Sequence, residues 1–287
     1  MHSQPLQSRH ISRSFGVTLV ELIVVMLLLS ILAVGVTTYV RLGAGMYMDA
    51  NAVQQVLQQS RFALERVVRE VRGAVPGSVR VAATADNSVS CVEFAPLAQS
   101  GIYRDLPLYP DRRNWIGVTS LNTGWTAQPG QRLTVYPTDA SHIYALNQGR
   151  SADVATVQNA PDDADGKAHT SRISLADIGA QPASFVTESP QRRFYLAAQP
   201  VSICRVGAEL RRYSNYGFLV AQPLPPLVNS DLLAVGLNNS SSEAVFSYSG
   251  ATLNRGAMLH LFWRFSPVAS QGQDLFFNHE VHIPNVP

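Results

Sequence analysis

The chain has 287 residues, of which 46% are hydrophobic and only 15% are charged, and its formal net charge is +2. Both excess charges, Arg9 and Arg13, lie in the first 16 residues, and the remainder holds 20 basic and 20 acidic side chains. This balance gives no support to nucleic-acid binding, which usually requires a basic patch. The length allows one large domain or two small ones.

The N-terminal segment predicts a membrane-spanning helix. From Val17 to Val40, Glu21 is the only charged residue, and about 20 apolar residues span a bilayer as a helix. Bases and no acids precede this run, so the N-terminus is expected in the cytoplasm and the residues after Arg41 outside. Glu21 needs an explanation, because an ionised group inside a membrane costs roughly 3 kcal/mol or more. There are two alternative interpretations of this run: a secretory signal peptide that is cut near residues 33–35, and a plain membrane anchor with a stray acid.

The stretch GVTLVEL, residues 16–22, resembles the processing motif of type IV prepilins. The resemblance implies the type IV pilin fold, with residues 1–16 as a leader that prepilin peptidase removes between Gly16 and Val17. It also implies N-methylation of Val17, where the family usually has Phe. In that family Glu21 pairs with the N-terminal amine of a neighbouring subunit, and such a partner charge offsets the cost of burying an acid.

An amphipathic pattern continues the helix through residues 46–72. At 100° per residue, its apolar side chains and Ser60 fall within one arc of about 120°: Met46, Val53, Val56, Leu57, Ser60, Leu64, Val67, Val68 and Val71. Gly73 and Pro76 end the helix, so one helix is predicted over residues 17–72. Phe62 lies outside the arc, where either the head covers it or it contacts a neighbouring subunit.

After Pro76 the hydrophobic period changes from 3.6 to 2, which predicts a β-rich head over residues 73–287. The expected strands are 78–83, 90–95, 131–136, 193–198, 201–206, 209–214, 217–221, 243–248, 257–265 and 274–283. Gly207 and Ala208 suit a two-residue hairpin turn. The prediction is an α+β fold, in which one long N-terminal helix packs on a mainly antiparallel sheet and shares its core.

Residues 99–130 and 147–182 are interpreted as inserted loops. Trp115 and Trp125 of the first could stack on sugars or dock a partner; the alternative is that they pin the loop to the sheet. Acidic residues at 162–166 hint at calcium but depart from an EF-hand loop, so a looser site and a solvated loop are the two interpretations.

Cys91 and Cys204 each lie in a predicted strand. In an exported domain an even pair predicts a disulfide, and two buried free thiols are the alternative. No nucleophile elbow, phosphate loop or convergent acid–base set is present, so we expect no enzyme and no cofactor. His279 and His282 would point to opposite faces of a strand, which argues against a metal site there.

Further stretches resemble particular minor pilins. Residues 59–81 are similar to the helix-to-head junction of the PilW and pseudopilin J type. Residues 188–206, 211–218 and 278–287 resemble, more narrowly, the MshO-type minor pilins of the mannose-sensitive haemagglutinin (MSHA) pilus. The resemblance implies a low-abundance subunit, stored in the inner membrane with its head in the periplasm and later part of a pilus at the cell surface.

The implied partners are other minor pilins, the major pilin, prepilin peptidase and the assembly platform of the inner membrane. In this interpretation the complex of minor pilins starts or caps the filament. Two alternatives share the motif and the helix: a pseudopilin J-like subunit of a type II secretion system, and a pilus adhesin that binds carbohydrate through the aromatic insertion.

Overall fold

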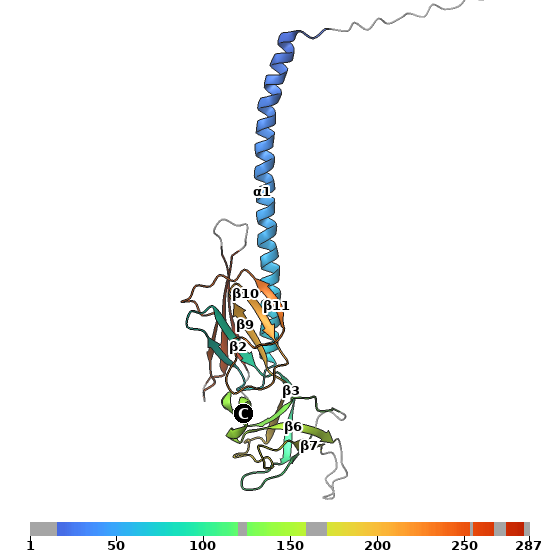
Figure 1. Ribbon diagram of the computed structural model, residues 1–287, viewed down its shortest axis with the longest axis vertical. Helices are drawn as coiled ribbons and strands as arrows, with labels where there is room; N and C mark the ends of the chain where they lie inside the picture. Colours follow the sequence, from blue (N-terminus) through green and yellow to red (C-terminus); the bar gives the residue numbers. More distant parts are fainter. Residues whose placement is uncertain (1–15, 120–124, 159–170, 253–254, 267–273, 284–287) are drawn as a thin grey trace, which may run out of the picture. The chain divides into compact units, whose positions relative to one another are not determined.

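The computed structural model describes residues 16–119, 125–158, 171–252, 255–266 and 274–283 (Figure 1). The chain divides into two compact units, one ending at Asn51 and one beginning at Ala52. Helix α1 (Leu19–Arg72) contributes to both. It begins two residues after the predicted start and ends at the predicted residue, before Gly73.

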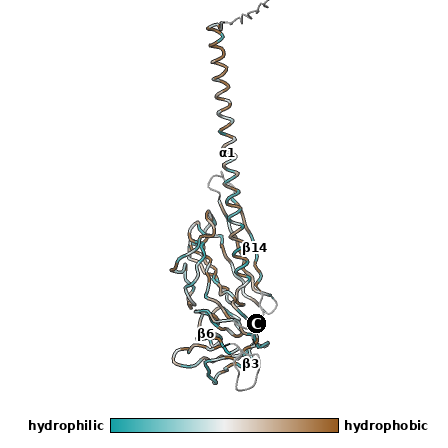
Figure 2. The backbone as a smooth tube through the Cα atoms, turned by 90° about the vertical axis from the view of Figure 1, so that its right-hand side faces the viewer, coloured by the Kyte–Doolittle hydropathy of each residue, from teal (hydrophilic) through white to brown (hydrophobic). Residues whose placement is uncertain are grey.

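In the first unit every described side chain from Gly16 to Asn51 is exposed. Figure 2 shows that hydrophobic residues dominate this part of α1, and α1 is long and apolar enough to cross a membrane. Three hydroxyl groups in this part of α1 form hydrogen bonds within the helix. Those of Ser30, Thr37 and Thr38 donate to the carbonyl oxygens four residues earlier, at 2.7, 2.6 and 2.9 Å. These bonds lower the cost of placing hydroxyl groups in an apolar environment.

In the second unit, α1 buries one face. Its buried residues are Ser60, Ala63, Val67 and Val71, and Val56, Leu64 and Val68 are partly buried beside them. The predicted apolar arc is therefore confirmed in this part of the helix. It is wrong for Met46, which is 63% exposed because it precedes the residues that the head covers.

Two antiparallel sheets share a core with this face of α1. The five-stranded sheet has the order β1 (Arg80–Ala83), β2 (Val89–Phe94), β9 (Val201–Val206), β10 (Glu209–Tyr213) and β11 (Ser230–Val235). The three-stranded sheet has the order β12 (Phe246–Ser249), β13 (Ala257–Phe265) and β14 (Leu275–Ile283). Residues from all three parts form the core, among them Val67, Val71, Phe94, Ile203, Leu233, Trp263 and Phe265. We call this assembly the two-sheet lobe.

A closed six-stranded barrel is inserted between β2 and β9. Its strands are β3 (Leu97–Asp105), β4 (Trp115–Thr119), β5 (Arg132–Val135), β6 (Ser151–Gln158), β7 (Ser171–Leu175) and β8 (Arg193–Ala197), closed in the order β3-β4-β7-β6-β5-β8. The short helix α2 (Ser141–Tyr144) and the 3-10 helix η1 (Leu146–Gln148) connect β5 to β6. The barrel has a core of its own, which includes Ile116, Val118, Leu133, Phe194 and Leu196.

The barrel corrects two predictions. The described parts of 99–130 and 147–182 are not inserted loops, because they contain β4, β6, β7 and most of β3. A single core shared by helix and head is also wrong, since the barrel residues form a separate hydrophobic cluster. The physical reason is closure: each strand is short, and every second residue of β4 and of β7 is buried once the barrel closes.

Other strand predictions have mixed outcomes. The Gly207–Ala208 turn joins β9 to β10, with Val206 opposite Glu209 and Gly207 at φ +60°, as predicted. The predicted strand 217–221 is wrong: it belongs to residues 214–229, the connection between β10 and β11. Strand β11 was not predicted. The acidic stretch 162–166, considered for calcium, lies outside the described residues.

Candidate functional site

The N-terminal segment places the predicted processing residues just before α1. The backbone of Gly16, Val17 and Thr18 is not helical. Nothing lies within 4 Å of the position that a Cβ would take at Gly16, and Val17 is 69% exposed. The peptide bond between Gly16 and Val17 is therefore in open, irregular backbone, the conformation that a peptidase needs at a scissile bond.

Thr18 and Glu21 act together at the start of the helix. The backbone N–H of Glu21 donates to the Thr18 hydroxyl at 3.3 Å, so Thr18 caps the helix. A Thr followed three residues later by Glu is the sequence of a capping box. A carboxylate in the first turn also interacts favourably with the helix dipole. The same two residues thus define where the helix begins and leave the carboxylate of Glu21 exposed.

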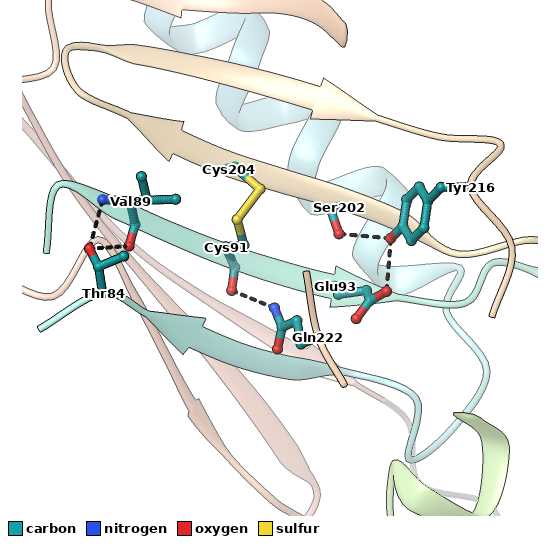
Figure 3. The surroundings of a disulfide bond; sticks show 8 residues. All are labelled: Thr84, Val89, Cys91, Glu93, Ser202, Cys204, Tyr216 and Gln222. Carbon is teal, nitrogen blue, oxygen red and sulfur yellow. Dashed lines mark hydrogen bonds between the residues drawn. A yellow bond between two sulfur atoms is a disulfide. The ribbon is translucent and has the colours of Figure 1, made fainter. Parts of the chain in front are cut away.

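The predicted disulfide is present in the head (Figure 3). Cys91 on β2 lies opposite Cys204 on β9, with Cα atoms 4.0 Å apart, and both side chains are fully buried. Tyr216 and Leu224 pack against the bridge, and the Gln222 amide donates to the Cys91 carbonyl oxygen at 3.0 Å. Residues 214–229 therefore cover this face of the five-stranded sheet, and we call them the cover segment.

A buried carboxylate lies beside the disulfide. The side chain of Glu93 is fully buried, and Arg80 Nε donates to it at 2.5 Å. The Tyr216 hydroxyl donates to its other oxygen at 2.9 Å and lies 2.7 Å from the Ser202 hydroxyl (Figure 3). Burial raises the pKa of Glu93, while Arg80 and then Tyr216 oppose that shift. Burial and the nearby Glu93 also raise the pKa of Tyr216.

Arg80 also joins the two-sheet lobe to its neighbours. Its two terminal nitrogens donate to the carbonyl oxygens of Val220 and Leu219, at 2.7 and 2.8 Å. Its guanidinium stacks on Tyr144 of α2, 3.7 Å from the ring centroid. Arg80 thus contacts Glu93, the cover segment and helix α2 of the barrel.

The barrel supplies a matching arginine. Arg132 on β5 is buried, donates to Asp153 at 2.7 Å, and donates to the carbonyl oxygens of Ile143 and Tyr144 at 2.9 and 3.1 Å. Its guanidinium lies 4.3 Å from the ring centroid of Phe218 in the cover segment. Each lobe therefore places an arginine against an aromatic ring of the other. No pattern in the sequence indicates this junction, and residues 217–221 of the cover segment do not form the predicted strand.

The aromatic residues singled out in the sequence lie in separate places. Trp115 is on β4, and the guanidinium groups of Arg113 and Arg172 lie 4.7 and 4.3 Å from its ring centroid. Trp125 packs against the barrel core. Phe62 on α1 is 58% exposed. The structure therefore gathers no common aromatic surface from these three residues, and their contact with a partner stays a prediction.

The two histidines considered for metal binding lie on β14. His279 pairs with Leu261 and is half-buried, whereas His282 pairs with Met258 and is exposed. They point to opposite faces of the strand. In the part of the chain that the structure describes, there is no group of three or more His, Cys, Asp or Glu side chains that could hold a metal ion.

Comparison with known families points to the N-terminal segment. Residues 11–37 match a family model described as the prokaryotic N-terminal methylation motif. This match supports a type IV pilin-like protein. It covers Gly16, Val17 and Glu21, and it implies a type IV pilus or secretion system with processing by prepilin peptidase. A long apolar helix followed by a mainly antiparallel head is compatible with a pilin-like α+β fold. No curated protein and no solved structure matched the chain.

Proposed function

We propose that the protein is a minor pilin of an MSHA-like type IV pilus that starts filament assembly within a complex of minor pilins. The observation that carries the proposal is the methylation motif at the start of α1, whose apolar first part, residues 19–51, exposes every side chain. The resemblance of residues 188–206 and 211–218 to MshO-type subunits supports the narrower assignment. The subunit acts structurally, and no catalytic role is assigned to it.

In this proposal prepilin peptidase cuts after Gly16 and the new amine of Val17 is methylated. The apolar part of α1 lies in the inner membrane, with the head in the periplasm, and then moves into the filament. Either environment removes the exposed apolar side chains from water, which is the main driving force for assembly. Glu21 pairs with the N-terminal amine of a neighbouring subunit, because an acid in that environment needs a partner charge.

The barrel supports a subunit present in few copies. It adds residues 97–197 to the head as a separately packed module. A filament built mainly of such subunits would have to accommodate this module at every position. A subunit that starts or caps the filament has no such constraint, because it is not repeated.

The proposal is tested by photo-crosslinking the full-length chain in native membranes, purifying it, and identifying its partners by mass spectrometry. Amine reagents are unsuitable, because Lys167 is the only lysine. Recovery of MSHA-type minor pilins is the expected result. Recovery of secretion pseudopilins would instead assign the chain to a pseudopilin J-like role in protein export. The matched control is Gly16→Arg, which is expected to keep its leader and lose the filament partners.

A further inference from the structure

A cavity of about 390 Å³ lies where the two-sheet lobe meets the barrel. Strand β1 and the ends of β12, β13 and β14 form one wall. Residues 138–140, which immediately precede α2, form the other wall. Cavities of this size at domain junctions are the usual place for ligands and for anchoring side chains of partners.

The floor and the rim of the cavity differ in chemistry. The floor is apolar: Val79, Ala257 and Ile283 line it and are no more than 3% exposed. Asp139, which is exposed, and Tyr248, which is half-buried, also line the cavity, and we call these two residues its rim. Such a site suits an apolar group that has a hydrogen-bond donor or a positive charge beside it.

Asp139 is the charge that this rim offers. Its carboxylate accepts a hydrogen bond from the Ser141 backbone N–H at 2.9 Å. Hydrogen bonds from Ser141 hold the pKa of Asp139 below its usual value, so it is ionised at neutral pH. Arg80 also lines the cavity, but its guanidinium is already bound to Glu93 and to the cover segment. The rim can therefore pair with a cation through Asp139, whereas the positive charge of Arg80 is less accessible to an anion.

The wall of the cavity includes an edge strand. Strand β1 pairs with β2 on one side and is the last strand of its sheet on the other. Arg80 and Val81 of β1 line the cavity. An edge strand can bind an extended peptide through main-chain hydrogen bonds, with pockets selecting its side chains.

We propose that the cavity receives an extended segment of another subunit, with one large apolar side chain on the floor and a neighbouring lysine or arginine paired with Asp139. Assigning that segment to a filament subunit rests on the proposed function. The recognition chemistry itself depends only on the cavity, the edge strand and the acid.

The test is a binding titration with the purified full-length chain in detergent. The probe is a fluorescein-labelled peptide, Ser-Lys-Leu-Lys-Val-Ser with a blocked C-terminus, followed by anisotropy. A second peptide with Glu in place of both Lys residues is expected to bind about tenfold more weakly or worse, because attraction to Asp139 becomes repulsion. Equal binding of the two peptides would overturn the proposal.

Two variants locate the binding. Gly250→Leu is expected to abolish it by filling the cavity, since a Cβ at Gly250 meets nothing within 4 Å and the fold should tolerate it. Asp139→Asn is expected to weaken the Lys peptide about threefold to fivefold. The controls are Ala85→Leu and Asp177→Asn, at exposed residues that do not line the cavity. Unchanged binding to Gly250→Leu, with a melting curve like that of the parent, would contradict the proposal.

The peptide-binding test and the crosslinking test of the proposed function can fail independently of each other. Peptide binding that follows these variants supports the cavity as a recognition site even if MSHA-type partners are not recovered. Recovery of those partners with no peptide binding would keep the proposed function and reject this inference.

Discussion

The two halves of helix α1 have opposite relations to the rest of the chain. Residues 19–51 expose every side chain, most of them apolar, whereas residues 52–72 bury one face in the two-sheet lobe. The second half is therefore stabilised by its own head. The first half exposes its apolar side chains, and it is long and apolar enough to cross a membrane, which would remove them from water. The difference separates residues that stabilise the head from residues that, in the proposed function, determine anchoring and assembly.

The two halves of α1 are expected to differ most in their response to a charged substitution. Val67→Asp puts an unpaired carboxylate into the core, because Val67 is fully buried, and is expected to cost more than about 4 kcal/mol of unfolding free energy. Val34→Asp makes the same change at a side chain that is 69% exposed. Urea unfolding in detergent checks both. An equal loss of head stability in the two variants would contradict the account.

Within the head, Glu93 is expected to have the next largest effect. Glu93→Leu leaves the guanidinium of Arg80 and the hydroxyl of Tyr216 without their buried acceptor and is expected to cost about 3 to 5 kcal/mol. The matched control is the double variant Arg80→Met/Glu93→Leu, which removes both charges and should recover much of that loss. A Glu93→Leu protein as stable as the parent would show that this buried contact does not stabilise the two-sheet lobe.

The pH dependence of Glu93 follows from the same burial. Burial raises its pKa above the ordinary value of 4.5, so the folded chain holds this proton more tightly than the unfolded chain does. The contribution of Glu93 to stability is then fully present below pH 4.5 and is lost as the pH rises through its folded pKa. Unfolding free energies of parent and Glu93→Gln are compared from about pH 4 to about pH 8. A difference that grows with rising pH would contradict the assigned direction.

The disulfide is expected to contribute somewhat less. Cys91 and Cys204 are separated by 113 residues in sequence, and closing so long a loop stabilises a fold by about 2 to 4 kcal/mol. Cys91→Ala/Cys204→Ala is expected to lower the unfolding free energy from urea titration by that amount, and reductant should then have no further effect. If reductant leaves the midpoint of the parent unchanged after full reduction, the bridge does not stabilise the two-sheet lobe.

Glu21 is expected to have the smallest effect on folding and a large one on assembly. Glu21→Val is expected to leave the head's unfolding unchanged, because the exposed carboxylate lies in the first unit. It should still be cut after Gly16 but enter filaments poorly. Counting the variant in purified filaments against its amount in membranes measures this. Normal incorporation would refute the pairing of Glu21 with a neighbouring amine.

The sequence predicted best the parts of the fold that are defined by a regular hydrophobic period. Strand β13 has the predicted bounds, Ala257–Phe265, and alternates buried and half-buried residues along its length. The two halves of α1 were separable for the same reason, since one is apolar all round and the other has a single apolar face. A regular pattern arises where one face of an element is buried by one neighbour.

The barrel and the junction were missed because their patterns depend on contacts distant in sequence. Strand β7 contains Ser171, Arg172 and Ser174 among its five residues, and its alternate side chains are buried only in the closed barrel. Strand β6 shows no regular alternation of buried residues. Arg80 and Glu93 look like surface charges until β1 pairs with β2 and the cover segment lies over them. The candidate processing site was predictable, because a local motif carries it.

The most direct test of the central claim is the mass of the N-terminal peptide of the chain isolated from native membranes. The account predicts a peptide that begins at Val17 and carries a methyl group on its amine. A peptide that begins at Met1, or one that begins near Gly35, would contradict processing at the methylation motif and with it the assignment to a pilin-like assembly.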